Sequence, residues 1–185
     1  MTATKLRLWT VEEYHRMIEA GIFPSEDKVE LLDGRIVKMS PQTPPHAATT
    51  QRIDRYLQNL LYNQAQIRVQ LPVTLSTSEP EPDIAVVRID NSYYSNIHPT
   101  TNNIFLLIEV SCSTLKYDKE EKGKIYGRDG ITDYWVLDVI ENLAYIYRNP
   151  TTTGYKQEII LSPNDIITPL AFPNTSISLS DLFLP

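Results

Sequence analysis

The sequence predicts an α/β fold in which a mixed central β-sheet is flanked by helices. Two short runs rich in branched apolar residues, 83–87 and 104–110, are typical of central strands covered on both faces. Residues 53–61 carry the spacing of a helix with one apolar face. Helix-like and strand-like segments intermix along 185 residues, of which 42% are hydrophobic, so one domain covering residues 1–185 is expected.

The N-terminal third is predicted to contain a helix, a hairpin and a second helix. Thr10 and Glu13 have the spacing of a capping box, and Gly21 fits the end of that first helix. Asp33-Gly34 lies between two strand-like runs and is typical of a two-residue hairpin turn. The second helix follows a proline-rich segment, and its apolar face consists of Ile53, Tyr56, Leu57, Leu60 and Leu61.

The rest of the chain is predicted to be mostly strands. Residues 65–76 alternate like one strand or two short ones, and the charged segment 117–130 has a helical composition. Three later strands are expected, at residues 133–139, 143–149 and 154–161. Asn149-Pro150 and Thr153-Gly154 are predicted to separate them.

Composition narrows the class of protein. The net charge of −6 and the pI of about 5.1 show no broad basic face for nucleic acid, although a local patch is compatible with them. Cys112 is the one cysteine, so no disulfide can form within the chain. The N-terminal segment lacks the apolar core of a signal peptide, and no apolar run has transmembrane length. A cytoplasmic protein without membrane contact is therefore expected.

Two carboxylates stand at strand positions where burial is costly. Glu109 lies inside the apolar run 104–110, and Asp83 precedes it by 26 positions (83 to 109), which is room for two neighbouring strands. Two carboxylates brought together at one sheet edge repel each other unless a cation lies between them. Mg²⁺ is commonly held by one or two carboxylates with water and substrate phosphate. The alternative is that Asp83 caps a turn and Glu109 pairs with a lysine.

Three residues of the charged segment share one helix face. Asp118, Lys122 and Tyr126 are spaced i, i+4 and i+8, so the lysine could reach over the carboxylates and act on phosphate as a point charge. Spacing alone favours a solvated helix with an Asp118–Lys122 ion pair. Glu30 is a further carboxylate on a predicted strand, and His46 at a helix start is more often a cap or surface residue than a catalyst.

Three segments together resemble a known family. They are "ELLDGRIVKMSP" with the later His46, "PDIAVV", and residues 109–138, the most specific part. They are similar to the Uma-two-type bacterial endonucleases of the PD-(D/E)XK, or restriction-endonuclease-like, superfamily, from about Leu8 to the C-terminus. The resemblance implies a restriction-endonuclease-like fold and an endodeoxyribonuclease that uses Mg²⁺ (or Mn²⁺) to hydrolyse phosphodiester bonds in DNA.

The resemblance also implies the site. The superfamily aspartate falls on Asp83, its second acid on Glu109, and an early acid on Glu30, which together would hold one or two Mg²⁺ ions. Ser111 stands where the strict pattern has a lysine, and the matching lysine is Lys122 on the following helix. Its expected role is to orient the nucleophile or to stabilise charge on the phosphoryl oxygens.

The sequence departs from the family pattern at two positions, and two alternative functions stay open. Cys112 stands where the family usually has proline, and Gly123 lies inside the charged helix at a cost of about 1 kcal/mol relative to alanine. The acidic pI favours a non-catalytic module of nuclease fold that binds nucleic acid or protein. A carboxylate-pair hydrolase such as a glycosidase is the third candidate. A homodimer is expected by fold-level analogy, because many nucleases cut two strands with two sites.

Overall fold

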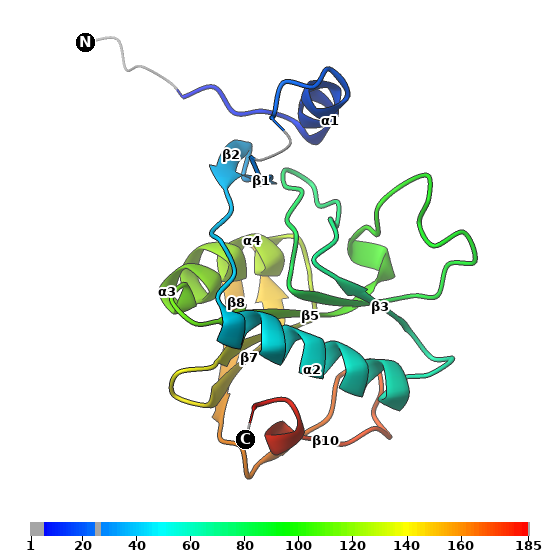
Figure 1. Cartoon of the computed structure of the whole chain (residues 1–185), viewed down its shortest axis with the longest axis vertical. Helices are drawn as coiled ribbons and strands as arrows, with labels where there is room; N and C mark the ends of the chain where they lie inside the picture. Colours follow the sequence, from blue (N-terminus) through cyan, green and yellow to red (C-terminus); the bar gives the residue numbers. More distant parts are fainter. Residues whose placement is uncertain (1–5, 25–26, 185) are drawn as a thin grey trace.

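The computed structural model describes residues 6–24 and 27–184, and its centre is a mixed six-stranded β-sheet (Figure 1). Its strand order is β3-β4-β5-β6-β7-β8. The strands are β3 (Gln66–Val69), β4 (Ile84–Val87), β5 (Ile104–Ser111), β6 (Asp133–Asp138), β7 (Leu143–Thr151) and β8 (Gly154–Leu161). β5 and β6 run parallel, and the other neighbours in this sheet are antiparallel. The predicted α/β class is confirmed, and the runs 83–87 and 104–110 supply neighbouring central strands, β4 and β5.

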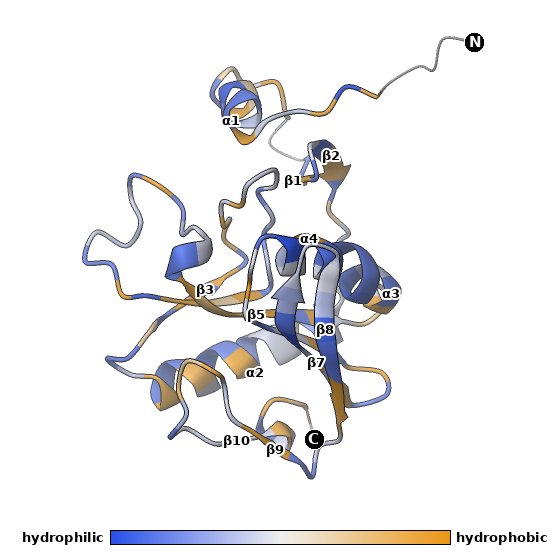
Figure 2. Cartoon of the chain, turned by 180° about the vertical axis from the view of Figure 1, so that it is seen from behind, coloured by the Kyte–Doolittle hydropathy of each residue, from blue (hydrophilic) through white to orange (hydrophobic). Residues whose placement is uncertain are grey.

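Both faces of the sheet are covered, which explains the continuous apolar runs. On one face, α2 (Pro44–Leu60) packs against Ile84 and Val86 of β4, together with the C-terminal elements β9 (Ile166–Ile167), β10 (Ile177–Ser178) and η3 (Leu179–Asp181). On the other face, α4 (Gly123–Arg128) packs on β7 and β8, and its Ile125 and Tyr126 belong to the same buried cluster as Ala85 and Val87 of β4. Figure 1 shows the sheet lying between α2 and α4, and Figure 2 shows the same layers from behind. A strand buried on both faces has no polar side to alternate with.

The predicted N-terminal elements are present. Helix α1 (Val11–Glu19) begins with the capping box, in which the Thr10 and Glu13 side chains each accept from the other residue's backbone N–H. The hairpin pairs β1 (Val29–Leu32) with β2 (Arg35–Lys38). Asp33 and Gly34 have φ values of 49° and 69°, as a two-residue turn matching the strand twist requires.

Within residues 65–76 the structure has one strand, β3, which is one of the two expected alternatives. One predicted feature differs. Asn149-Pro150 does not end a strand, because β7 continues to Thr151 and pairs Pro150 with Tyr155 of β8. The pairing of β7 with β6 ends at Arg148, so at Pro150 one side of β7 is a free edge. Proline, which has no N–H, is tolerated there because no hydrogen bond to a neighbouring strand is lost on that side.

Across residues 6–24 and 27–184, no helix is both long and apolar enough to cross a membrane. Residues 1–5, part of the N-terminal segment expected to lack a signal peptide, fall outside the described residues.

Helix α4 approaches β8 so closely that position 127 requires glycine. A Cβ on Gly127 would lie 2.4 Å from the carbonyl oxygen of Gly154 and 2.7 Å from its Cα. Gly127→Ala is therefore expected to destabilise the fold by about 1–3 kcal/mol or more, because backbone must move to admit one methyl group. Urea unfolding measures the change.

Gly123→Ala is the matched control. Its added Cβ would meet atoms of Asp118 and Tyr134 at 3.6 and 3.7 Å, which is ordinary contact. The higher helix propensity of alanine should make this variant neutral or more stable by up to about 1 kcal/mol. Equal losses of stability in the two variants would contradict the close-approach argument.

Candidate active site

One cavity of about 920 Å³ contains all four site residues that the sequence indicated. Glu30, Asp83, Glu109 and Lys122 all line it. They come from β1, from the residue before β4, from β5 and from the helical segment after β5. The start of α2 and residues 112–114 also line the cavity, so its walls come from both sides of the sheet edge.

The pairing of β4 with β5 brings the two central carboxylates together. The antiparallel register matches Ile84 with Ile108, and its next step places Asp83 opposite Glu109. The Asp83 carboxylate also accepts the backbone N–H of Val110, with 2.8 Å between Oδ2 and N. The expectation that neighbouring strands carry both acids to one edge is therefore confirmed.

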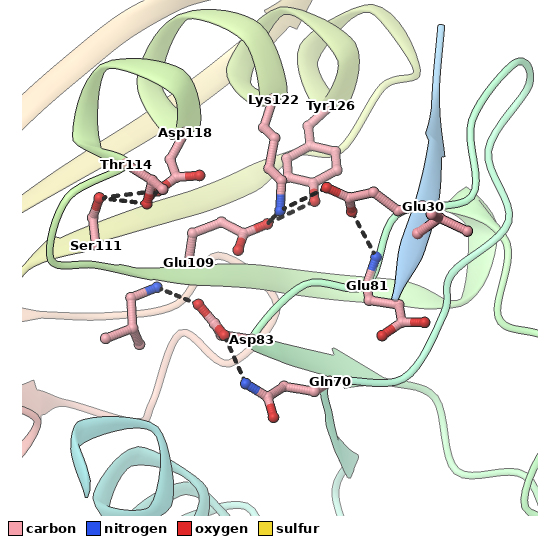
Figure 3. Close-up of polar contacts among 12 residues, drawn as sticks. Glu30, Gln70, Glu81, Asp83, Glu109, Ser111, Thr114, Asp118, Lys122 and Tyr126 are labelled. Atoms are coloured by element: carbon pink, nitrogen blue, oxygen red, sulfur yellow. Dashed lines mark hydrogen bonds and ion pairs between the residues drawn. The ribbon is translucent and has the colours of Figure 1, made fainter. Parts of the chain in front are cut away.

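Asp83 is held by three donors. Besides Val110 N–H, its Oδ2 lies 3.1 Å from His46 Nε2. Its Oδ1 accepts from Gln70 Nε2 at 3.1 Å (Figure 3). Burial acts to raise the pKa of Asp83, but the hydrogen bond and charge of His46, with the other two donors, lower it on balance. In turn, the hydrogen bond to Asp83 raises the pKa of His46. The carboxylate is thus kept ionised and fixed in direction.

Glu109 is buried and shares one oxygen between two donors. Its Oε1 accepts from Lys122 Nζ at 3.0 Å and from Tyr126 OH at 2.8 Å (Figure 3). Burial raises the pKa of Glu109 to about 8, against the lowering effect of Lys122 and with further increases from Asp83 and Asp118. The lysine partner considered as the alternative is present, and the same carboxylate still lines the cavity.

The surroundings of Lys122 differ from those that helical spacing alone favoured. Spacing favoured a solvated lysine paired with Asp118, but Lys122 is 7% exposed and lies 3.0 Å from Glu109 and 3.7 Å from Glu30 Oε1. Burial acts to lower its pKa, but the charges of Glu109, Glu30 and Asp118 raise it. Lys122 is therefore a buried cation among carboxylates.

The local helix geometry causes this difference. The charged segment is not one α-helix but α3 (Leu115–Tyr117), a π-helical turn η2 (Asp118–Lys122) and α4. The N–H of Gly123 donates to Asp118 O five residues back, which widens the turn. A helical pattern with a period of 3.6 residues does not predict such a turn. Single π-helical turns inside α-helices are frequent at functional sites.

Asp118 has partners of its own. Its Oδ2 accepts from Ser111 Oγ at 2.9 Å and from Thr114 Oγ1 at 2.6 Å. Burial raises the pKa of this carboxyl, against the lowering effect of Lys122. Ser111 occupies the position of the usual lysine. Its hydrogen bond to Asp118 thus fixes the start of the helical segment that carries Lys122.

Four residues at this site were not selected as site residues from the sequence. They are His46, Gln70, Asp118 and Tyr126, and Asp118 and Tyr126 were noted only for sharing a helix face with Lys122. His46 reaches Asp83 across 37 positions and Gln70 across 13, so spacing gives no signal for either contact.

Two of the three predicted metal ligands, Asp83 and Glu109, lie opposite each other on the cavity wall, where they could share a divalent cation. Within the described residues, no three His, Cys, Asp or Glu side chains form a ready-made cluster that could hold a metal ion. Glu30 is engaged on the other side, by Lys122 and by the backbone N–H of Glu81 at 3.2 Å. Asp83 and Glu109 remain as two oxygen donors on one cavity, a usual set for Mg²⁺ with waters and phosphate. Burial raises the pKa of Glu109, so a hard cation bound beside it would stabilise the ionised carboxylate.

Without a cation, ionisation of Glu109 should work against the fold. Its folded pKa of about 8 lies above its ordinary value of 4.5, so between these pH values the folded state holds a proton that the unfolded chain has released. Stability should therefore fall as the pH rises through this window, by up to about 1.4 kcal/mol per pH unit, and level off above it. Urea unfolding in a chelator at several pH values measures this slope.

Glu109→Gln should flatten most of that slope. Some should remain because the raised pKa of His46 gives stability that is lost as the pH rises through its folded value. An unchanged slope in the variant would show that Glu109 is not the group responsible.

A mixed sheet with acids and a lysine gathered at one edge is the arrangement of the restriction-endonuclease-like class of folds. Residues 11–180 match the Uma2 family, described as "Putative restriction endonuclease", and the chain belongs to this family. The fold is also similar to the crystal structure of a "putative nuclease belonging to DUF820" from Anabaena variabilis ATCC 29413, with a TM-score of 0.73 and 21% identity over 94% of this chain and 97% of the other. No curated protein matches the chain.

Proposed function

We propose that this protein is an endonuclease that hydrolyses DNA phosphodiester bonds with Mg²⁺ or Mn²⁺. The observation that carries the proposal is Lys122, a buried cation in contact with Glu109 and Glu30 at the wall of a cavity that Asp83 also lines. Membership of a family described as "Putative restriction endonuclease" supports it, as does the likeness in fold to a protein titled a "putative nuclease". A lysine among acids suits phosphate chemistry, because it supplies a fixed positive charge for phosphoryl oxygens.

Each residue has a role that follows from its contacts. A divalent cation held by Asp83 and Glu109, with Glu30 beside them, would polarise the scissile phosphate and lower the pKa of a water. Lys122 would place its charge on the phosphoryl oxygens or orient the nucleophile.

Four neighbours position these groups. Tyr126 fixes the direction of Glu109 through a hydrogen bond of 2.8 Å. His46, Gln70 and the N–H of Val110 fix Asp83 from three directions. Side chains locked in this way keep the geometry that the reaction needs.

The negative charge of the chain also affects DNA binding. With a net charge of −6 and several carboxylates in the cavity, a DNA phosphate is repelled unless a cation intervenes. Tight DNA binding, like cleavage, should therefore require a divalent ion.

The test uses supercoiled plasmid and circular single-stranded DNA as substrates. Nicked, linear or shortened products are expected with Mg²⁺ or Mn²⁺ and none with a chelator. DNA binding without cleavage of either substrate would favour the non-catalytic module instead. Cleavage that persists at full rate in the chelator would contradict the role of Asp83 and Glu109 as cation ligands.

A further inference from the structure

A second cavity, of about 520 Å³, lies beside the first. The two cavities share one residue, Glu81, which lines both. The second cavity is bounded by α1 on one side and by the loop of residues 94–100 on the other. Its size is in the range of small-molecule and nucleotide sites. A group bound there would thus be next to a phosphate bound in the first cavity.

The walls of the second cavity are largely aromatic and apolar, and the buried carboxylate of Glu79 links their two sides. The lining side chains of this kind are Tyr14, His15, Ile18, Pro72, Tyr94, Ile97 and His98. Buried Glu79 ties the two sides together, since its Oε1 lies 2.6 Å from His15 Nε2 and 3.7 Å from His98 Nε2. Its Oε2 accepts from Thr74 at 2.9 Å, so Glu79 is fully engaged and shapes the cavity.

Glu81 differs from Glu79 in having no such partners. Its backbone N–H donates to Glu30 Oε2, which fixes this segment against the catalytic cavity. Among residues 6–24 and 27–184, no side chain or N–H forms a hydrogen bond or ion pair with the Glu81 carboxylate. Figure 3 shows this carboxylate pointing away from the group formed by Lys122, Glu109 and Glu30. It is a half-buried acceptor on the wall between the two cavities.

The chemistry of this cavity selects its ligand. Glu19, Glu79 and Glu81 all line it, so a phosphate would be repelled from it. A nucleobase suits it, because flat aromatic and apolar walls stack on a base whatever its sequence. A free carboxylate accepts from an exocyclic amino group, as in the pairing of Glu or Asp with cytosine N4.

We propose that the second cavity takes an unpaired nucleobase with an exocyclic amino group, one nucleotide away from the phosphate in the catalytic cavity, and that Glu81 accepts the hydrogen bond from that group. The inference rests on the proposed nuclease function and narrows its substrate class. A base can enter only if it is unpaired, so the preferred DNA is single-stranded, flapped or locally melted. Thymine, which has no amino group, is the disfavoured base.

The test measures the binding of single-stranded homopolymers of about 12 nucleotides, a length within the usual site size. Fluorescence anisotropy is recorded with Ca²⁺ as the oxygen-binding cation, and oligo-dC, oligo-dA and oligo-dT are the probes. Wild type is expected to bind oligo-dC and oligo-dA at least fivefold more tightly than oligo-dT. Glu81→Gln should reduce this preference below twofold, because an amide can also donate to the thymine carbonyl. Equal affinity of wild type for all three, or an unchanged preference in Glu81→Gln, would overturn the inference.

A second variant tests the wall of the cavity without disturbing the fold. Ile97 is 71% exposed, so Ile97→Ala should fold normally and weaken oligo-dC binding about threefold or more while leaving duplex binding unchanged. Ile140→Ala is the control, since this isoleucine is 66% exposed and lines neither cavity. Undiminished oligo-dC binding by Ile97→Ala would overturn the inference. Mg²⁺-dependent cleavage of plasmid in that case would leave the proposed function standing, so the two failures are distinguishable.

Discussion

Lys122→Ala is expected to cleave DNA about 10²–10³-fold more slowly than wild type, the usual loss when one electrostatic contact to a transition state is removed. The same change should also destabilise the fold by about 3–5 kcal/mol, because Glu109 and Glu30 lose their buried counter-charge. An exposed lysine would have tolerated alanine, so the stability loss is a direct consequence of its burial. Plasmid cleavage rates and urea unfolding measure the two effects.

Two further variants separate catalysis from folding. In Lys122→Met combined with Glu109→Gln, both partners are neutral, so much of the lost stability should return while cleavage stays low. Lys124→Ala is the surface control, since its side chain is 60% exposed and pairs only loosely with Glu121 at 3.6 Å. If Lys124→Ala lost as much activity as Lys122→Ala, the segment would serve general attraction of DNA and the role assigned to Lys122 would be wrong.

The features that could be predicted from the sequence are those set by local chemistry. The capping box of α1 and the Asp33-Gly34 turn depend on residues three positions apart or fewer, and both are present. The apolar runs around Glu109 have the length and composition of central strands, and a separation of 26 residues suits a strand and its returning neighbour. Strand composition and spacing therefore allowed Asp83 and Glu109 to meet, and the family resemblance selected the same two acids.

The features that could not be predicted depend on geometry that leaves no periodic mark. The π-turn at Asp118–Lys122 redirects Lys122 toward Glu109, and spacing of 3.6 residues pointed instead to an Asp118 partner. His46 gains its role from the start of α2 meeting the edge of β4, a contact that no local pattern encodes. Glu30 lies beside Lys122, so its share in holding a cation stays a prediction.

Asp83→Asn is expected to abolish most of the stabilisation that Mg²⁺ gives and to slow cleavage by about 10²–10³-fold. A ligand at 100 times its Kd stabilises the native state by about 2.7 kcal/mol, which for a chain of this length is a rise in Tm of roughly 5–10 °C. In the variant the asparagine oxygen can still accept from Val110 and His46, and the Gln70 amide can turn to accept from the new NH₂. The fold should thus survive with a loss of about 1–3 kcal/mol.

The Mg²⁺ response, and not the starting Tm, decides the outcome of this experiment. Asp54→Asn is the matched control, because Asp54 lies on α2, accepts only from Gln58 among the described residues, and lines neither cavity. Its response to Mg²⁺ should equal that of wild type, while Asp83→Asn should show less than about a third of the rise, since the negative charge that attracts the cation is lost. The fall in the pKa of His46 once Asp83 is neutral gives an independent NMR check that the intended contact was altered. A full Mg²⁺ response in Asp83→Asn would mean that the ion binds elsewhere, and the cation site at Asp83 and Glu109 would have to be abandoned.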